Sequence, residues 1–527
     1  MQNKPRLDRA ACMLDPGQSI SLSIIGNKKG DQYTFTSGDS SIVNVNQNGQ
    51  IEAKSCGETI VTACSDTDTL SCLVTVGFPS QNPYLPPSWN LFIADGEPHV
   101  FDGKMYIYGS RDCPNGFLDE TVKKDWCSPD YHVIWSDDLL HWTDAGKAIS
   151  VEDIPPEIRG TGNRLWAPDI FKSPKDNKYY LLFCTNGANV FIADSEEPTG
   201  PFGNIRRITL GQQELCTIDP AALVDDDGTV YIALPGDFFI AKLDPEDYSR
   251  IIPESKIDLK PLIEEADEEY FPFEGPSLRK HNGLYYYVYI SSRKGEFVPT
   301  QMSYLVSCDP MDISSWRHVG SFINTRGFIK AGNVHGGFEE FGGKHFLSYH
   351  TMARGFEKFT RTMNLDELKF NTDGAIQPVI RTSSGAKGCF SAGETVLAAS
   401  AIGFENGRED DRFIRLSEDD SENQVLFHSA VVSLQSGLWV LYRYFAFLEN
   451  AKKASIRYKC QKESVLQIEA LNGDNTCATK VHLPASNQWQ TFDADIFLPS
   501  GQWEIRLSLE QALDDQSTFL LSQFSLG

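Results

Sequence analysis

Residues 95–108 read Asp-Gly-Glu-Pro-His-Val-Phe-Asp-Gly-Lys-Met-Tyr-Ile-Tyr, and this combination of a polar residue, a turn and an aromatic run decides the fold. Asp95 stands eight residues before Gly103, the turn residue that opens the run. A strand with a polar side chain, then a glycine turn and a second strand, indicates a β-hairpin. Four more such units follow, again with eight or nine residues from the polar residue to the turn residue: Asp169 and Asn177, Asp219 and Gly228, Glu274 and Gly283, and His335 and Gly343.

The five units repeat every 50–75 residues, which predicts a radial array of small sheets, a five-bladed β-propeller. The first strands of all blades line the central channel of a propeller, so we expect the five polar residues to converge on one volume there. Four carboxylates and a histidine in one channel predict an active site or a metal site rather than a core.

The composition favours an all-β chain of two or three domains. The chain has 527 residues with 41 glycines and 27 prolines but only 7 methionines. A net charge of −25 argues against nucleic acid and anionic membranes as partners, and no apolar segment is long enough to suggest membrane insertion. Such a surface tolerates neutral partners such as sugars. The twelve cysteines form no Cys-x-x-Cys motif, and their pairing stays open.

Residues 1–78 predict a small all-β domain, with strand-like runs between glycine and asparagine turns. The segment resembles the bacterial Ig-like domain, group 2, and the most specific part of the match is SSIVNV at residues 40–45 followed by NGQI at residues 48–51. Such domains act as spacers or adhesion modules. The resemblance implies a passive β-sandwich before the propeller.

Residues 82–380 resemble glycoside hydrolase family 43, with the motifs in the family's order. The carrying segments are LFIADGEPHVFDGKMYIYGSRD, RLWAPDIFKSPKDNKYYLLF, TIDPAALVDDDGTVYIALPG, FEGPSLRKHNGLYYYVY and GNVHGGFEEFGGKHFLSYH. The resemblance implies Asp95 as general base, Asp169 as the carboxylate that tunes and positions the acid, and Glu274 as general acid. It further implies that Asp219 in the third blade and Arg361 contact the substrate, and that His335 holds a structural calcium or its waters.

The first motif departs from the family, because Asp-Pro is replaced by the sequence Asp95-Gly96-Glu97-Pro98. Glu97 lies two residues after Asp95 and points to the same face of a regular strand, so it is the alternative base. Trp166 and Phe273 are candidates for stacking on a pentose ring, with blade packing as the alternative role for each.

Residues 388–527 predict a β-sandwich that resembles carbohydrate-binding module family 6, a jelly roll with a structural calcium and a sugar cleft. Glu394 matches an acidic residue near the family's first strand, a candidate calcium ligand, and Trp489 is a candidate stacking residue. Leu520 and Ser522 stand where the family usually has Asn and Asp. Sugar binding and a purely structural role therefore both stay open.

Together these features predict an inverting glycoside hydrolase of plant hemicellulose, which releases terminal pentoses as an α-L-arabinofuranosidase or β-xylosidase. Inversion expects the acid and base ~6.5–9.5 Å apart, with water between them. The alternatives are a galactose- or galactofuranose-releasing enzyme on the same scaffold and a non-catalytic carbohydrate-binding adhesin. We expect no catalytic cofactor, a polysaccharide or oligosaccharide substrate, and a secreted or cell-surface bacterial protein. The oligomeric state stays open.

Overall fold

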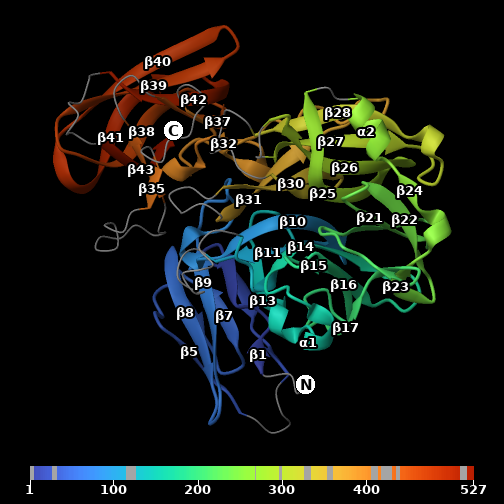
Figure 1. The fold of residues 1–527 in the computed structure, drawn as a ribbon. Helices are drawn as coiled ribbons and strands as arrows, with labels where there is room; N and C mark the ends of the chain where they lie inside the picture. The colour runs from blue at the N-terminus through green and yellow to red at the C-terminus, as the bar shows by residue number, and fades with distance from the viewer. Residues whose placement is uncertain are drawn as a thin grey trace.

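The structure is a computed structural model that describes residues 5–26, 32–113, 126–266, 269–295, 299–325, 334–352, 360–404, 414–416, 430–434, 439–510 and 519–527. Sheets dominate these residues (Figure 1), as the sequence predicts. The two α-helices are short: α1 (Pro156–Arg159) and α2 (Lys260–Ala266). Single 3-10 turns occupy Pro87–Trp89, Val151–Asp153, Pro253–Ser255, Ile313–Ser315, Gly385–Lys387 and Ala398–Ser400.

Five antiparallel sheets, which we number blades 1 to 5, follow one another around a ring. The first strand of each blade contacts the first strand of the next, and the fifth contacts the first, so the ring is closed. The predicted five-bladed propeller is thereby confirmed. The strands, first strand of each blade first, are β10 (Phe92–Phe101), β11 (Lys104–Asp112), β12 (Asp130–Ser136) and β13 (Thr143–Ser150); β14 (Leu165–Lys172), β15 (Tyr179–Thr185), β16 (Asn189–Ser195) and β17 (Gly203–Arg207); β20 (Ala221–Val224), β21 (Val230–Leu234), β22 (Phe239–Asp244) and β23 (Asp247–Ile251); β25 (Tyr270–His281), β26 (Leu284–Arg293), β27 (Pro299–Ser307) and β28 (Arg317–Asn324); and β29 (Gly336–Phe341), β30 (Lys344–Met352) and β31 (Arg361–Leu368).

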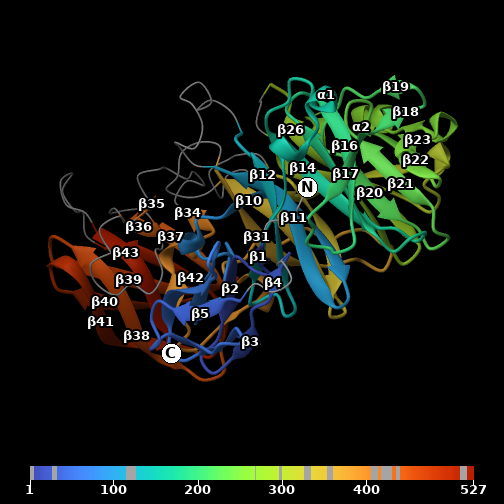
Figure 2. The same cartoon turned by 90° about the horizontal axis from the view of Figure 1, so that it is seen from below.

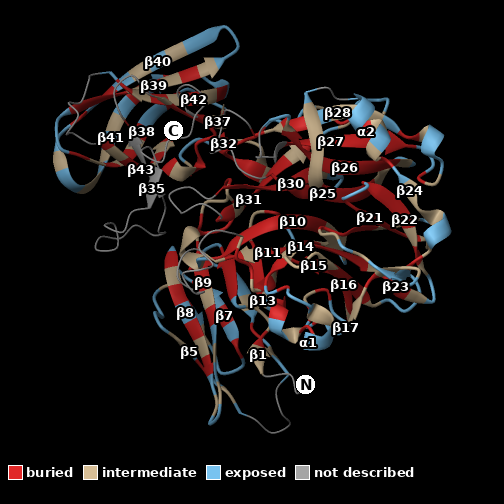
Figure 3. Cartoon of the chain, viewed as in Figure 1, coloured by how far each residue is buried: buried red, intermediate tan, exposed pale blue. Residues whose placement is uncertain are grey.

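Apolar side chains fill the space between neighbouring blades. Ile93 and Met105 of blade 1 pack with Phe346 and Met363 of blade 5, which seals the ring where its two ends meet. Similar clusters lie between the other neighbours, as the buried inner strands of Figure 3 indicate. Alternate residues of each strand face alternate neighbours, so the blades are buried on both faces.

The hairpin turns have the chemistry that the sequence predicts. Asp102 and Gly103 both have positive φ, at 50° and 77°, and so do Asn282 and Gly283, at 49° and 76°. Two consecutive positive φ values define the two-residue turn that matches the twist of antiparallel strands. Blades 2 and 3 differ, because Lys172 pairs with Tyr179 and Val224 with Val230, which leaves longer turns of residues 173–178 and 225–229.

The N-terminal segment shares a sheet with the propeller. β2 (Ala11–Leu14) pairs with β13 at the outer edge of blade 1 and, in parallel, with β9 (Thr69–Val76). One sheet therefore runs across the predicted boundary after residue 78, and Figure 2 shows the two parts side by side. The remaining N-terminal strands are β8 (Gly57–Cys64) and β5 (Thr34–Ser37) on that sheet, β3 (Ser19–Ser21), β7 (Gln50–Ala53) and β6 (Val43–Val45) on a second, and the pair β1 (Arg6–Leu7) and β4 (Ile24–Ile25).

The C-terminal segment forms two facing sheets around one apolar core. The side chain of Gln81 ties it to the propeller, because its Oε1 accepts hydrogen bonds from Leu397 N at 2.9 Å and Ser400 Oγ at 2.8 Å. The strands are β32 (Phe390–Ser391), β37 (Trp439–Phe447), β42 (Gly501–Leu509), β39 (Ser464–Asn472), β40 (Asn475–Leu483) and β34 (Gly403–Phe404) in one sheet, and β35 (Ile414–Leu416), β36 (Ala430–Leu434), β43 (Phe519–Leu526), β38 (Ala451–Cys460), β41 (Ser486–Leu498) and β33 (Val396–Leu397) in the other.

Short two-residue strands complete blade 3: β18 (Thr209–Leu210), β19 (Gln213–Glu214) and β24 (Ile257–Asp258). All twelve cysteines are free thiols. In the described part of the chain, no helix has the length and apolar character to cross a bilayer.

Candidate active site

Strand register divides the channel into two levels. Glu97, Asp169, Ala221, Ser277 and Gly337 each pair with the fifth residue after the turn residue of their own hairpin, and we name them the Glu97 level. Two residues earlier on each first strand stand Asp95, Ala167, Asp219, Gly275 and His335, which with Glu274 we name the Asp95 level. Four of the five predicted polar residues therefore share a level.

Asp169 is the exception. It is eight residues before Asn177, as Asp95 is before Gly103, but the turn of blade 2 is longer than that of blade 1. The extra turn residues move Asp169 toward the hairpin end of the channel. The expectation that all five polar residues converge is therefore wrong for Asp169, and the blade 2 residue at the Asp95 level is Ala167.

The backbone is strained where two of the carboxylates enter the channel. Asp95 has a φ of 54° and Asp219 a φ of 49°, a region that side chains other than glycine rarely occupy. Asp95 lies in a bulge between Ala94 and Glu97. Strain of this kind costs on the order of 1–3 kcal/mol per residue and clusters at functional sites, so these two positions are candidates for chemistry.

Asp95 is a buried carboxylate held in its charged form. Its Oδ1 accepts a hydrogen bond from Arg361 Nη1 at 2.7 Å, its Oδ2 accepts one from Ser110 Oγ at 2.6 Å, and its N–H donates to His350 Nδ1 at 2.9 Å. Burial alone would raise the pKa of Asp95, but the charge of Arg361 and the neighbouring histidines hold it well below its ordinary range. Asp95 therefore carries a negative charge at any working pH.

Arg361 is fixed in turn by a second carboxylate. Its Nε and Nη2 donate to Asp112 at 2.8 and 2.9 Å, a bidentate pair, and the face of Trp126 lies 4.1 Å away. The predicted contact of Arg361 with the site is thus a salt bridge to Asp95, which sets the orientation of that carboxylate.

Asp219 and Glu274 are the other two carboxyl groups of the level. The N–H of Gly275, the residue after Glu274, donates to the Asp219 carboxylate, and the N–H of Asp219 donates to Cys184 Sγ at 3.2 Å. Burial raises the pKa of Asp219 well above its ordinary value, and the charge of Glu274 raises it further. A negative charge on Glu274 therefore disfavours a second negative charge on Asp219. Sequence reasoning placed Asp219 only among the substrate-binding residues.

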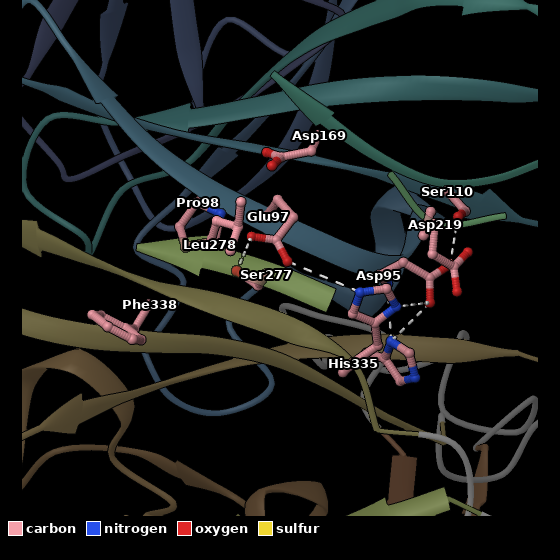
Figure 4. A network of polar contacts seen from close by, with 12 residues as sticks. Asp95, Glu97, Pro98, Ser110, Asp169, Asp219, Ser277, Leu278, His335 and Phe338 are labelled. Carbon is pink, nitrogen blue, oxygen red and sulfur yellow. Dashed lines mark hydrogen bonds and ion pairs between the residues drawn. The ribbon is translucent and has the colours of Figure 1, made fainter. Parts of the chain in front are cut away.

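His335, a member of the Asp95 level, lies between Asp95 and Glu97 (Figure 4). Its Nδ1 lies 3.6 Å from Asp95 Oδ1 and its Nε2 lies 4.0 Å from Glu97 Oε1. Burial lowers the pKa of His335, but hydrogen bonding to Asp95 and the charges of Asp95, Asp219 and Glu97 outweigh burial and raise it to about 9. A cationic His335 partly offsets the surplus negative charge of the Asp95 level.

The Glu97 level is a closed network of ion pairs and hydrogen bonds. Glu97 Oε2 accepts from Arg279 Nη2 at 2.6 Å and from Ser277 Oγ at 3.0 Å. A Cβ at Gly337 would come within 2.2 Å of the same oxygen, so the close approach of this strand requires glycine. Burial raises the pKa of Glu97, and the charge of Arg279 only partly offsets it. Glu97, the alternative base, is thus committed to a buried ion pair.

Asp169 completes this network. Its Oδ1 lies 2.6 Å from His99 Nε2, and its Oδ2 accepts from the N–H of Ala222 at 2.7 Å. Burial opposes ionisation of Asp169, but the charge and hydrogen bond of His99 hold its pKa below the ordinary value. Figure 4 shows Asp169 on the Glu97 side of the network and Asp219 on the Asp95 side.

The other predicted contact residues lie in two places. Trp166 is half-buried beside Ala167 of the Asp95 level, and Phe273 is half-buried beside Glu274 with its ring 6.1 Å from that of Phe271. Trp166 also packs against the apolar cluster between blades 2 and 3, which is the alternative role given for it above. Trp489 lies on β41 of the C-terminal segment, half-buried with an indole Nε1 that has no hydrogen-bond partner among the described residues.

Side-chain groups with the spacing of metal ligands contain neither His335 nor Glu394, within the ranges that the structure describes. Calcium takes six to eight oxygen ligands, whereas His335 faces Asp95 and Glu97, whose charges Arg361 and Arg279 already compensate. Glu394 is engaged by Lys387 Nζ at 2.9 Å and by the N–H of Ser391. The donor sets at both positions therefore do not fit calcium.

Several site residues carry no local signal in the sequence. Arg279, His350 and Asp112 lie on second strands or far along first strands, with nothing that distinguishes them from blade packing residues. The hydrogen-bond partners Arg361 and Asp112 are 249 positions apart. Only the closure of the ring brings such residues together.

The Asp95 level can perform acid–base chemistry on a neutral substrate. It holds a carboxylate, Asp95, whose pKa is lowered, and a second one, Asp219, whose pKa is raised beside Glu274. Environments that push the pKa values of two carboxyls apart mark the base and the acid of a hydrolytic site. The Glu97 level, whose carboxylates are already paired, offers no such difference.

Comparison with known proteins agrees with this chemistry. A model of the family described as glycosyl hydrolases family 43 matches residues 98–376, more than half of the chain. A xylosidase/arabinosidase of Thermoclostridium stercorarium is 27% identical over 475 residues, which cover 80% of this chain and 94% of the relative. A xylosidase/arabinosidase of Bacteroides ovatus is 28% identical over 338 residues, 56% of this chain and 97% of the relative. Among solved structures, a family 43 β-xylosidase/α-arabinofuranosidase from a compost metagenome is 26% identical, covers 58% of this chain and all of its own, and has a TM-score of 0.45.

Proposed function

Since this chain belongs to glycosyl hydrolases family 43 and is a glycoside hydrolase, we propose that it releases terminal pentoses from plant hemicellulose or related glycans with inversion of configuration. The bonds cleaved are those of an α-L-arabinofuranosidase, a β-xylosidase or both, the activities named for the relatives above. The observation that carries the proposal is the split in the Asp95 level, where the pKa of Asp95 is held well below its ordinary range and the pKa of Asp219, beside Glu274, is raised well above it.

Asp95 is the proposed general base. Arg361 and Ser110 occupy one direction at each of its oxygens, and a carboxylate oxygen accepts more than one hydrogen bond. A water between Asp95 and the anomeric carbon gives up its proton to the remaining lone pairs as it attacks. The salt bridge to Arg361 lowers the basicity of Asp95, so its contribution rests on orientation and charge as much as on proton affinity.

Glu274 is the proposed general acid. It is the more exposed member of the Asp219–Glu274 pair and therefore the one that reaches the glycosidic oxygen. Asp219, whose pKa is raised by burial and by the charge of Glu274, accepts a hydrogen bond from the N–H of Gly275 and so helps to orient the acid. In this assignment, Asp219 tunes and positions the general acid, the role that the sequence resemblance implied for Asp169. Protonation of the glycosidic oxygen by Glu274 lets the rest of the substrate leave as an alcohol. Glu274 then regains its proton from solvent.

The enzymatic proposal is tested with aryl α-L-arabinofuranosides and aryl β-D-xylosides. Wild type should release the aryl group, Glu274→Gln should not, and Glu246→Gln, an exposed glutamate between β22 and β23 of blade 3, should match wild type. The anomeric configuration of the first sugar formed, read by NMR, should be inverted. Equal inactivity of wild type and Glu274→Gln on a broad glycan panel would instead favour the non-catalytic adhesin. Release of galactofuranose would favour the galactose- or galactofuranose-releasing enzyme.

The flanking segments have proposed roles of their own. Residues 1–78 would be an Ig-like spacer, and residues 388–527 a family 6-like carbohydrate-binding module, in a secreted or cell-surface protein. The supporting observations are the sequence resemblances and the two-sheet arrangement of the C-terminal segment. A structural calcium has no support from the donor sets at His335 and Glu394, and no step of the mechanism uses one.

A further inference from the structure

A second group of chemically versatile side chains lies at the hairpin end of blades 4 and 5. It consists of His281 at the end of β25, Glu340 near the end of β29, and His345 near the start of β30. One ligand atom from each lies within 4.8 Å of the others. From Glu274 to His281 is seven residues of one strand, so the group lies roughly 20 Å from the Asp95 level.

Two neighbouring hairpins build the group. Glu340 and His345 are directly paired across β29 and β30 and flank the Gly342-Gly343 turn. His281 comes from the adjacent hairpin, just before the Asn282-Gly283 turn. Both turns are tight and have positive φ. The three ligands therefore come from rigid elements, which favours a defined geometry.

Packing and hydrogen bonding orient the two imidazoles. The ring of His281 stacks on Phe370 at 4.2 Å, and its centroid lies 4.3 Å from that of His345. Asn282 Nδ2 lies 2.9 Å from His281 Nε2. Metal-binding histidines usually have their rings held by such neighbouring groups.

We propose that His281, Glu340 and His345 bind a Zn²⁺ ion that links blades 4 and 5. Two imidazoles and one carboxylate with water in the fourth position form a known ligand set for zinc. Tetrahedral zinc with ligands at ~2.0–2.1 Å separates its ligand atoms by about 3.4 Å. His345 Nε2 and Glu340 Oε2 are already 3.7 Å apart.

The surroundings leave the ligands available. The Glu340 side chain is 56% exposed, so it can move to close the remaining gap. Lys344, next to His345, pairs with Glu367 at 3.5 Å, and Lys280, next to His281, pairs with Asp225 and Asp226. The other described group with ligand spacing, Glu97, His99 and Asp169, already has Arg279 against it at 2.6 Å. A cation is therefore favoured at the hairpin end and not inside the channel.

The experiment is a Zn²⁺ titration of the full chain, freed of metal with a chelator, by isothermal calorimetry. Zinc bound by free cysteines contributes equally in all variants, so the difference between variants reports on the proposed site alone. His345→Ala should lose one equivalent of Zn²⁺ or bind it at least ~10-fold more weakly. Glu340→Gln, which should leave the fold unchanged because the side chain is exposed, should also weaken zinc binding. His482→Ala, an exposed histidine on β40, should bind zinc like wild type.

A second readout is the zinc-dependent shift of the thermal unfolding midpoint, because binding to the folded state raises it. Wild type should shift upward and both ligand variants should lose that shift, while pentoside hydrolysis without zinc stays at the wild-type rate in all of them. Identical stoichiometry, affinity and thermal shift in wild type, His345→Ala and Glu340→Gln would overturn the zinc site. Neither result depends on the identity of the sugar substrate.

Discussion

The Asp95 level and the Glu97 level lie next to each other in one channel, each with carboxylates from different blades, yet they differ in charge balance. In the Glu97 level, Glu97 is paired with Arg279, and Asp169 with His99 and a backbone N–H. In the Asp95 level, Asp95, Asp219, Glu274 and nearby Asp112 share Arg361 and His335. A surplus of buried negative charge must take up a proton, and that proton is what a hydrolase needs.

The largest expected effect tests the chemical role of the Asp95 level. Glu274→Gln and Asp95→Asn should each lower kcat/KM on aryl pentosides by ~10²–10⁴-fold, because each removes one proton transfer. The unfolding midpoint of Glu274→Gln should stay near wild type, since its side chain is only half-buried. A loss below ~10-fold for Glu274→Gln would place the acid elsewhere.

The next effect tests the structural role of the Glu97 level. Glu97→Gln should destabilise the folded protein by about 3–5 kcal/mol, because it removes the carboxylate that lies 2.6 Å from the buried Arg279 guanidinium. Chemical denaturation measures this loss. Arg250→Ala, which breaks an exposed ion pair with Asp244, should cost less than about 1 kcal/mol. Similar costs for both variants would contradict a buried ion pair at Glu97.

The pH dependence of stability reports on His335, which joins the levels. Its pKa rises from 6.5 to about 9 on folding. A raised folded-state pKa gives stability that is complete below about pH 6.5 and disappears as pH rises through about 9. Wild type should lose about 3 kcal/mol over this window from this group, and His335→Gln should lose correspondingly less.

A surface histidine provides the matched control for that measurement. The pKa of His141 is also raised to about 9, through its hydrogen bond to Asp138, but the group is only half-buried. Solvent screening reduces what such a pair contributes. Denaturation curves of His141→Gln should therefore follow wild type across the same pH range, and a flat wild-type profile would refute the charged His335.

The smallest effect compares the two aspartates that compete for the tuning role. Asp219→Asn should lower kcat by ~10–100-fold, and the alkaline limb of the pH–rate profile should move to lower pH. The reason is that removing a neighbouring negative charge lowers the pKa of Glu274. Asp169→Asn should leave that limb in place. A shift with Asp169→Asn instead of Asp219→Asn would restore the assignment made from sequence.

The five-fold repeat and the hairpins could be predicted from sequence, whereas the roles of Asp95 as base and Glu274 as acid stay proposals that rest on the resemblance to the family. The repeat and the hairpins are predictable because turn chemistry and alternation are local properties: Asp102-Gly103 and Asn282-Gly283 specify tight turns whatever surrounds them. The choice between Asp95 and Glu97 as base needed the structure. Residues 95–98 alone predict neither the bulge at Gly96 nor the ion pair of Glu97 with Arg279.

What the sequence determined by itself is therefore the ring of blades and the polar residue that each blade directs toward the channel. Only the tertiary structure decided how far along the channel each polar residue lies and which residues it contacts. Asp169 lies in the Glu97 level and Asp219 in the Asp95 level, and Arg361 contacts both Asp95 and Asp112. Counting residues back from a turn assumes equal turns and regular strands, and a six-residue turn in blade 2 or a bulge in blade 1 breaks that count. Charge balance then follows from contacts between residues hundreds of positions apart, which exist only once the ring has closed.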